Sequence, residues 1–440
     1  VAVVTDNRRL VMNWRQNTIV NLSRDFLDTN GVKQHINVVV ETPAKETCYL
    51  DHIPGKVAAL APDLEKAWLE NLKDLNVCSQ KGLAERFDSS IGGNSVLMPF
   101  GGKNQLTPTE GMVAKLPVIG AETTTATAMT YGYNPYLMEW SPFHGAMYAV
   151  IESVAKMVAL GGRADKIRLT FQEYFESLGT DSRKWGRPFA ALLGALWAQH
   201  QLEIPAIGGK DSMSGTFMDL TVPPTLTSFA VDVMKADNAL SPEFKVAGSK
   251  VYYVPMPKDK LAMPDFRKLR DTYEKVSNFI AAKKVFAASS VRMGGTAAAI
   301  TKMCLGNGIG FRFNSKPSME DLFKADYGAL ILEVAPDSDI KEALAGTGCY
   351  ELGTTTQNSN IVAGEAVIGF AEAKKAYTSP LEKIFPTKVK VGEKKTASEY
   401  IYTGGNRVTP KVGIAKPKIF IPVFPGTNCE YDTARAFSRA

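Results

Sequence analysis

Cysteine and histidine are scarce in this chain of 440 residues, which holds five cysteines and four histidines. The cysteines are widely spaced and form no CxxC pair, which argues against a zinc site and against a disulfide framework. The hydrophobic runs are far shorter than the roughly 20 residues that span a bilayer. No dense block of lysine and arginine follows the pattern of a phosphodiester-binding protein. We therefore expect no membrane span and no nucleic-acid partner, and reduced thiols favour the cytoplasm.

The composition is that of a folded enzyme-sized protein. Hydrophobic residues make up 45% and charged residues 22%, and 51 basic side chains face 45 acidic ones. A net charge of +6 over this length specifies no class of partner. At roughly 100–200 residues per domain, the length predicts two to four domains.

Helical and strand-like patterns alternate along most of the chain, which predicts an α/β (α+β) fold. The expected strands are residues 9–14, 36–40, 95–100, 114–119, 121–131, 166–171, 204–207, 225–234, 251–254, 328–334 and 363–373. The expected helices are residues 64–75, 79–88, 143–160, 189–201, 266–284 and 296–304. Near the C-terminus, residues 418–424 suggest a buried strand followed by a turn and a helix over 432–440. One such unit cannot bury both faces of its strand, so we expect the chain to be an internal piece of a longer polypeptide.

The strongest candidate site follows the predicted strand 204–207. It is a loop of glycine, lysine, aspartate and hydroxyl residues: Gly208, Gly209, Lys210, Asp211, Ser212, Met213 and Ser214. Glycines let the backbone approach a ligand, lysine supplies a charge, and aspartate can hold Mg²⁺, so the loop suits a phosphate-bearing ligand. The spacing is not that of a P-loop. The alternative is a tight structural turn with a solvated lysine.

Two weaker candidates lie elsewhere. Gly294 and Gly295 open a predicted helix, where backbone N–H groups can bind an anion, although such a pair often serves close packing only. Glu152 lies on an otherwise apolar helix and is a candidate Mg²⁺ ligand. It is also four residues from Lys156, so a simple ion pair or an exposed helix edge is the favoured alternative.

Two segments carry a resemblance to a known family. Residues 208–214 resemble the signature loop of the large, single-chain phosphoribosylformylglycinamidine synthases, and residues 424–432 resemble the opening of their glutaminase domain. The resemblance covers nearly all of the chain. It implies domains of the aminoimidazole ribonucleotide synthetase type, in an N-terminal and a C-terminal form, and the start of a class I glutaminase-like domain. The implied divisions are the tail of a first-half domain (1–41), a linker and helix (42–78), the second-half N-terminal-type domain (79–235), its C-terminal-type domain (236–376), a linker (377–415) and the first glutaminase unit (416–440).

The resemblance also implies an activity in purine biosynthesis. Such synthases use ATP, with Mg²⁺, to phosphorylate the amide of formylglycinamide ribonucleotide, and ammonia from glutamine then displaces the phosphate. The synthetase histidine is expected upstream of residue 1, and the glutaminase cysteine, histidine and glutamate beyond residue 440. The implied partners are the small-molecule substrates, an upstream synthetase half and a downstream glutaminase domain of the same polypeptide. We therefore expect this chain alone to be inactive.

The chain departs from the family pattern at its second nucleotide site. Glu152 matches a family carboxylate, but Lys156 stands where an asparagine is expected, and Arg292 lies where an acidic segment is expected. A cation site that loses oxygen ligands and gains positive charges should bind Mg²⁺ poorly, so we expect this site to be degenerate. Two alternatives remain: a non-catalytic scaffold half, and another ATP-dependent enzyme of the aminoimidazole ribonucleotide synthetase superfamily.

Overall fold

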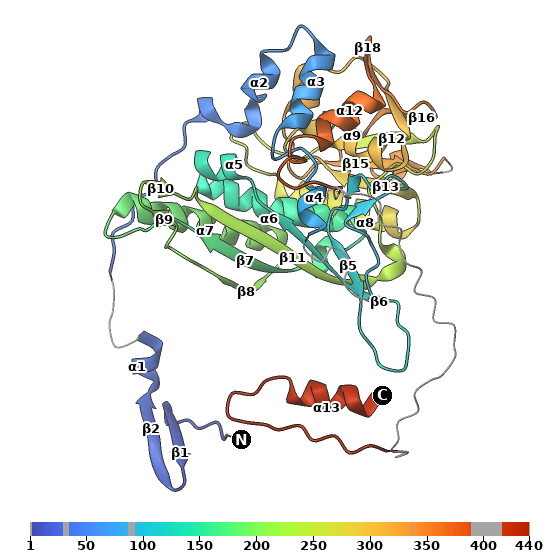
Figure 1. Cartoon of the computed structure of the whole chain (residues 1–440). Coiled ribbons are helices and arrows are strands. Elements are labelled where there is room, and N and C mark those ends of the chain that lie inside the picture. The colour runs from blue at the N-terminus through green and yellow to red at the C-terminus, as the bar shows by residue number, and fades with distance from the viewer. Residues whose placement is uncertain (1, 30–34, 87–92, 337, 389–415, 440) are drawn as a thin grey trace. The chain divides into compact units, whose positions relative to one another are not determined.

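The computed structural model describes residues 2–29, 35–86, 93–336, 338–388 and 416–439. The chain divides into two units, residues 1–388 and 389–440, and we describe each by itself. The first unit contains two large sheets with helices (Figure 1). Within the part of the chain that the structure describes, no helix is long and apolar enough to cross a membrane.

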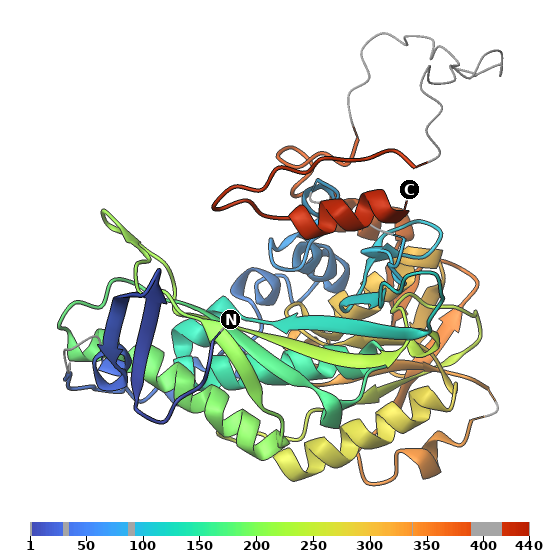
Figure 2. The ribbon, with the colours of Figure 1, turned by 90° about the horizontal axis from the view of Figure 1, so that it is seen from below.

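The first large sheet has five strands in the order β5-β6-β11-β7-β8. The strands are β5 (Met112–Lys115), β6 (Thr125–Gly132), β7 (Arg168–Tyr174), β8 (Ala206–Lys210) and β11 (Thr225–Lys235). All neighbouring pairs are antiparallel except β7 and β8, which run parallel. Helices α5 (Pro135–Trp140), α6 (Pro142–Ala159) and α7 (Ser182–Leu202) belong to this part, and Figures 1 and 2 show α6 and α7 together on one face of the sheet.

Alternation along β6 and β11 explains this packing. Every second residue of both strands is buried, and small side chains such as Ala126, Ala128 and Ala230 let α6 lie close to the sheet. Helix α6 is apolar on nearly all sides, as expected for a helix enclosed by other elements. Proline follows the serine cap at its N-terminus, where the missing N–H costs no helical hydrogen bond.

The second large sheet has seven strands in the order β13-β15-β12-β16-β14-β17-β18. These are β12 (Lys250–Val254), β13 (Val285–Ser290), β14 (Gly310–Phe313), β15 (Leu330–Val334), β16 (Tyr350–Thr356), β17 (Ile361–Ala363) and β18 (Ala366–Ile368). Its helices are α8 (Phe266–Ala281), α9 (Gly295–Asn307), α10 (Met319–Phe323), α11 (Ile340–Ala343) and α12 (Phe370–Thr378). The two sheets thus fall on either side of residue 236, where the sequence predicts a domain boundary.

Shorter elements complete the first unit. They are β1 (Arg9–Trp14), β2 (Asn17–Ser23), α1 (Arg24–Thr29), α2 (Gly55–Ala58), α3 (Leu64–Lys73), α4 (Lys81–Ala84), β3 (Phe100–Gly101), β4 (Thr107–Pro108), β9 (Thr216–Phe217) and β10 (Leu220–Thr221), with short 3-10 turns η1 (Lys45–Thr47), η2 (Tyr49–Asp51), η3 (Ala164–Lys166) and η4 (Ala236–Asn238). Trp68 of α3 is fully buried and donates a hydrogen bond from Nε1 to Thr301 Oγ1 of α9 at 2.9 Å. This contact ties the segment before the first large sheet to the helices of the second.

The described part of the second unit contains α13 (Glu430–Arg439), close to the predicted helix. The predicted buried strand over residues 418–424 is wrong: these residues form no strand and are largely exposed, Phe420 at 87%. A strand needs a neighbouring strand for its backbone hydrogen bonds, and none accompanies it in the described residues. The predicted linker 377–415 overlaps the end of α12, and residues 389–415 lie outside the described part.

Three other expectations need correction. Residues 36–40 form no strand and run beside the start of α7, where Val39 N donates to Ser182 O. The predicted strand 363–373 divides into the β17–β18 hairpin and α12, because Gly364 (φ +63°) makes a tight turn between the two strands. Of the predicted strand 95–100, only one bridge at Ser95 and the start of β3 are present.

Candidate functional site

The predicted phosphate loop begins on an edge strand. Gly208, Gly209 and Lys210 belong to β8, the outermost strand beside β7, and all three are exposed. A side chain at Gly209 would lie 2.5 Å from the carbonyl oxygen of Phe171, so this position requires glycine for close approach to β7. The rest of the loop is anchored at Ser212, whose carbonyl accepts a hydrogen bond from Phe175 N at 2.9 Å.

The loop presents polar groups, and its residues do not line the three cavities described below. Asp211 is exposed, and the hydroxyls of Ser212 and Ser214 lie 3.3 Å apart. Met213 packs partly against the hydrophobic core. The role of the loop as a ligand contact therefore stays a prediction.

A buried carboxylate lies beneath the loop. Glu173 of β7 is only 6% exposed, and its Oε1 has no hydrogen-bond partner among the described residues. Burial, with a smaller contribution from the charge of Asp211, raises the pKa of Glu173 to about 7. Side chains of β7 alternate between its two faces, and this alternation predicts that Glu173 faces inward. A glutamate at an inward-facing position is the sequence signal by which this residue could have been found.

The glycine pair at the start of α9 is a packing feature in this structure. Gly294 (φ +85°) and Gly295 (φ +62°) are both buried and left-handed, and a side chain at Gly295 would lie 2.3 Å from Leu322 O. Asn71 Nδ2 donates to Gly294 O at 2.9 Å. Gly294 also lines a cavity of about 510 Å³ beside the stacked rings of Tyr49 and Tyr136. The predicted anion contact of the pair stays untested.

Glu152 lies inside the protein and is paired with a cation from its own helix. Lys156 Nζ is 2.7 Å from Glu152 Oε1, and the two side chains are 1% and 5% exposed. Lys156 also donates to Tyr131 O at 2.7 Å, and Glu152 Oε2 accepts from Tyr133 N at 3.0 Å. The Lys156 ammonium thus occupies one oxygen of the carboxylate on this helix that the sequence proposes as a metal ligand.

A second charged group lies near this pair. Glu110 precedes β5, and its carboxylate accepts hydrogen bonds from Ser289 Oγ (2.9 Å), Ser290 N (3.1 Å) and Ser290 Oγ (2.6 Å) at the end of β13. Arg292 and Lys302 lie close by. Burial alone would lower the pKa of the Arg292 guanidinium, but the negative charges of Glu110 and Glu152 have the larger effect and raise it. Burial, then the charge of Arg292, lowers the pKa of Lys302 to about 7.

These side chains surround a cavity of about 510 Å³, which we call the cationic cavity. Its lining includes Glu110, Lys156, Arg292, Lys302, Tyr131 and Tyr377. The residues come from segments far apart in the sequence, and of the charged ones Glu110 and Lys302 were not predicted. Lys302 carries a signal similar to that of Glu152, a charged side chain on an otherwise apolar helix.

The donor set of the cationic cavity does not suit Mg²⁺. Magnesium requires several oxygen ligands, and both nearby carboxylates already accept hydrogen bonds or an ion pair. In the described ranges, no group of three or more histidine, cysteine, aspartate or glutamate side chains could hold a metal ion. Magnesium at Glu152 is therefore not supported by these residues.

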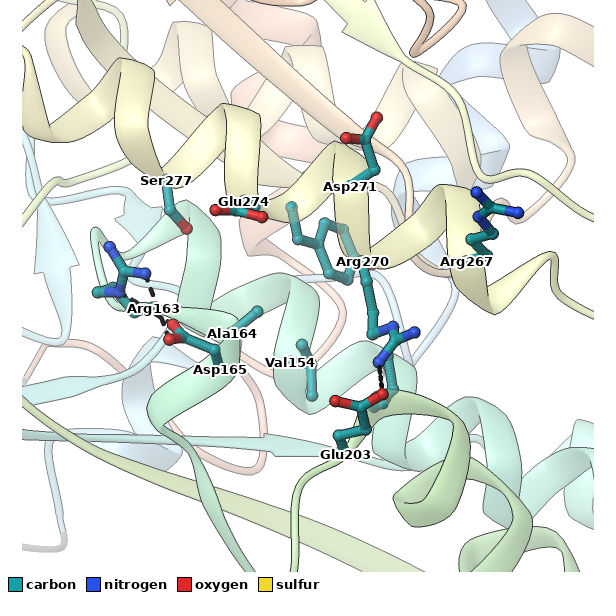
Figure 3. Close-up of a pocket in the computed structure, with 12 residues that line it drawn as sticks. Val154, Arg163, Ala164, Asp165, Glu203, Arg267, Arg270, Asp271, Glu274 and Ser277 are labelled. Carbon is teal, nitrogen blue, oxygen red and sulfur yellow. Dashed lines mark hydrogen bonds and ion pairs between the residues drawn. The ribbon is translucent and has the colours of Figure 1, made fainter.

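A third hollow, of about 440 Å³, lies between α6, η3, the end of α7 and α8. Figure 3 shows its charged groups facing one another: Arg163 contacts Asp165, and Arg270 contacts Glu203. Because positive and negative side chains alternate around it and form pairs, the hollow favours no ligand charge.

The sequence of this chain is similar to that of known proteins. No protein-family model matches the chain. The phosphoribosylformylglycinamidine synthase subunit PurL of Thermoplasma acidophilum is 22% identical over 375 residues, which cover 77% of this chain and 46% of the relative. The PurL subunit of Picrophilus torridus is 26% identical over 356 residues, covering 73% and 45%. The chain is similar to PurL.

Solved structures agree at the level of the fold. T. maritima PurL complexed with FGAR has a TM-score of 0.53 at 12% identity, covering 71% of this chain and 54% of that one. T. maritima PurL complexed with AMPPCP has a TM-score of 0.51 at 16% identity, covering 80% and 50%. The predicted α/β class of the synthetase type is thus confirmed, and the chain spans about half the length of the curated PurL relatives it matches.

Proposed function

We propose that this chain is one pseudo-symmetric half of a PurL-type synthase that converts formylglycinamide ribonucleotide, ATP and ammonia from glutamine to formylglycinamidine ribonucleotide. The observation that carries the proposal is similarity to PurL subunits over about three quarters of the chain, together with a PurL-like fold. The enzyme would be an ATP-dependent carbon–nitrogen ligase of purine biosynthesis in the cytoplasm.

The proposed reaction has two steps. The amide oxygen of the substrate attacks the γ-phosphoryl group of ATP and releases ADP. Ammonia then attacks the activated carbon, phosphate leaves with that oxygen, and the amidine forms after loss of a proton. ATP and Mg²⁺ belong to the whole synthase in this proposal, and no step passes through a metal held by this chain.

The contribution of this half is a ligand contact at the edge of its first sheet. Lys210 is exposed, and the backbone of Gly208 and Gly209 is accessible on an edge strand, which suits contact with a phosphate from outside the chain. In this proposal a neighbouring part of the enzyme completes the site around the loop. The relatives are about twice as long as the matched region, and this supports such an arrangement.

Residues 416–440 enter the proposal as the start of a glutaminase domain in the same polypeptide. The support is the sequence resemblance of residues 424–432 and the helix that follows at α13. In this arrangement glutamine hydrolysis would occur downstream, and ammonia would reach the synthetase within one protein.

A scaffold role is the second candidate, favoured by the exposure of the loop. The test is Lys210→Ala in the polypeptide that carries this chain, with Lys260→Ala, another exposed lysine, as the matched control. A ligand contact predicts that Lys210→Ala raises KM for formylglycinamide ribonucleotide roughly tenfold or more, since a charge-assisted contact contributes about 1.5–3 kcal/mol. A scaffold role predicts that Lys210→Ala and the control Lys260→Ala have the same kinetics.

A further inference from the structure

Lys302 is a partly buried lysine that has no carboxylate of its own. It lies on α9, where every other side chain is uncharged, and it lines the cationic cavity. Among the described residues its ammonium makes no ion pair and no hydrogen bond, and the centre of the Tyr377 ring lies 5.8 Å from it. Taking an ammonium out of water costs free energy unless an opposite charge or an acceptor compensates it.

The carboxylates near the cavity are matched by other cations. Lys156 forms an ion pair of 2.7 Å with Glu152. The charges of Glu110 and Glu152 both stabilise the guanidinium of Arg292. Two carboxylates therefore face two cations, and a proton on Lys302 would add a third positive charge without a counterpart.

The surroundings of Lys302 favour its neutral form. Burial, then the charge of Arg292, lowers its pKa to about 7, and Lys156 acts in the same direction. Glu110 and the Cys78 thiolate act in the opposite direction with a smaller combined effect, and burial raises the pKa of that thiol. About half of the Lys302 side chains are then uncharged at pH 7, against roughly one in 2,500 for a lysine in water.

A neutral amine of this kind is a nucleophile. A lysine becomes reactive when burial or a neighbouring cation removes its proton, because the free electron pair can then attack a carbonyl carbon. Lysine side chains are also the usual targets of acetylation. An acetyl amide suits the charges around the cavity, since it is uncharged and leaves the two carboxylates and the two cations in balance.

We propose that Lys302 is a site of acetylation by a small activated acetyl donor, and that the acetyl group then occupies part of the cationic cavity. The amine nitrogen attacks the carbonyl carbon of an acyl phosphate, and a C–N bond forms. The C–O bond to phosphate breaks, phosphate leaves with the electron pair, and the nitrogen loses a proton to water. A thioester reacts in the same way, with a thiolate as the leaving group. The inference does not depend on the ligase activity proposed above.

The experiment is acetylation of the whole chain at about pH 7, with acetyl phosphate or with acetyl coenzyme A, followed by mass spectrometry of each lysine peptide. The exposed lysines Lys103 and Lys260 are internal references. We expect Lys302 to react tenfold or more faster than either, because its larger neutral fraction outweighs the weaker nucleophilicity of a less basic amine. The faster of the two reagents identifies the acyl phosphate or the thioester as the donor.

The pH profile of the unaltered protein gives a second readout that needs no variant. Acetylation of Lys302 should level off above about pH 8, whereas the reference lysines should gain about tenfold per pH unit up to about pH 9. Arg292→Gln removes a charge that disfavours protonated Lys302, so it should slow the reaction at pH 7 and move the plateau to higher pH. Arg267→Gln, which removes an exposed arginine from α8, is the matched control.

Three results would overturn the inference. The first is acetylation of Lys302 no faster than that of the reference lysines. The second is a pH profile for Lys302 that keeps rising in parallel with theirs. The third is an acetyl group in the cavity that hydroxylamine removes, because this reagent cleaves a thioester at Cys78 and leaves an amide at Lys302 intact.

Discussion

Glu173 offers the sharpest test of the electrostatics at the sequence-predicted loop. Its carboxylate is 6% exposed, one oxygen has no partner among the described residues, and its pKa is raised from 4.5 to about 7. A carboxyl group that holds its proton more tightly in the folded state makes folding less favourable as pH rises. We therefore predict that Glu173→Gln stabilises the protein at alkaline pH and has less effect in acid.

The magnitude follows from the two pKa values. Each unit of pKa difference corresponds to about 1.4 kcal/mol, so the full cost of ionising Glu173 in the folded protein is about 3 kcal/mol. Below about pH 4.5 the carboxyl is protonated in both states and the cost vanishes; between 4.5 and 7 only the unfolded state loses its proton. The destabilisation therefore develops across this window and is complete above about pH 7.

The assay is urea denaturation of the wild-type chain and Glu173→Gln at about pH 5 and about pH 8. The stability gain of the variant should be larger at pH 8 by about 2.5 kcal/mol, and the wild-type chain supplies the reference at each pH. Glu274→Gln, which removes an exposed carboxylate from α8, is the matched control. A gain that is the same at both pH values would refute the reasoning, since a neutral packing effect has no such pH dependence.

Two further predictions concern buried contacts of α6 and α7. Lys156→Met should destabilise the chain by about 3–5 kcal/mol in urea denaturation, because it leaves Glu152 buried without its cation. Adding Glu152→Gln should recover much of this loss of stability. A Lys156→Met variant as stable as the wild type would contradict the prediction. Gly194→Ala should lower the melting temperature, although alanine favours helices by about 1 kcal/mol over glycine. The reason is that the new methyl group would lie 2.0 Å from Phe143 O. An unchanged or raised melting temperature would contradict this prediction and show that α6 and α7 can separate at little cost.

The fold class was predictable because its signals are periodic and local. Helix α6 and strand β11 appear within a few residues of their predicted ends, since apolar spacing and the glycines at 161–162 mark them in the sequence. The hairpin of β17 and β18 was misjudged because its two strands are only three residues each. The exposed segment 418–424 was misjudged because an apolar run predicts burial only where a partner strand exists.

The candidate sites were predictable only in part. The loop 208–214 and Glu152 stand out locally, and the ion pair of Glu152 with Lys156 follows from their spacing of four residues. The cationic cavity was not predictable as a unit, because Glu110, Arg292 and Lys302 are brought together by contacts between the two large sheets and their helices. Tertiary packing of this kind leaves no fixed spacing in the chain.

The most direct test of the central proposal is ADP formation by the polypeptide that carries this chain, measured with ATP, ammonium and formylglycinamide ribonucleotide. The proposal predicts ADP and formylglycinamidine ribonucleotide in equal amounts, and none when the formylglycinamide substrate is omitted. ATP consumption that ignores this substrate, or that requires formylglycinamidine ribonucleotide instead, would contradict it and favour another synthetase of the same superfamily.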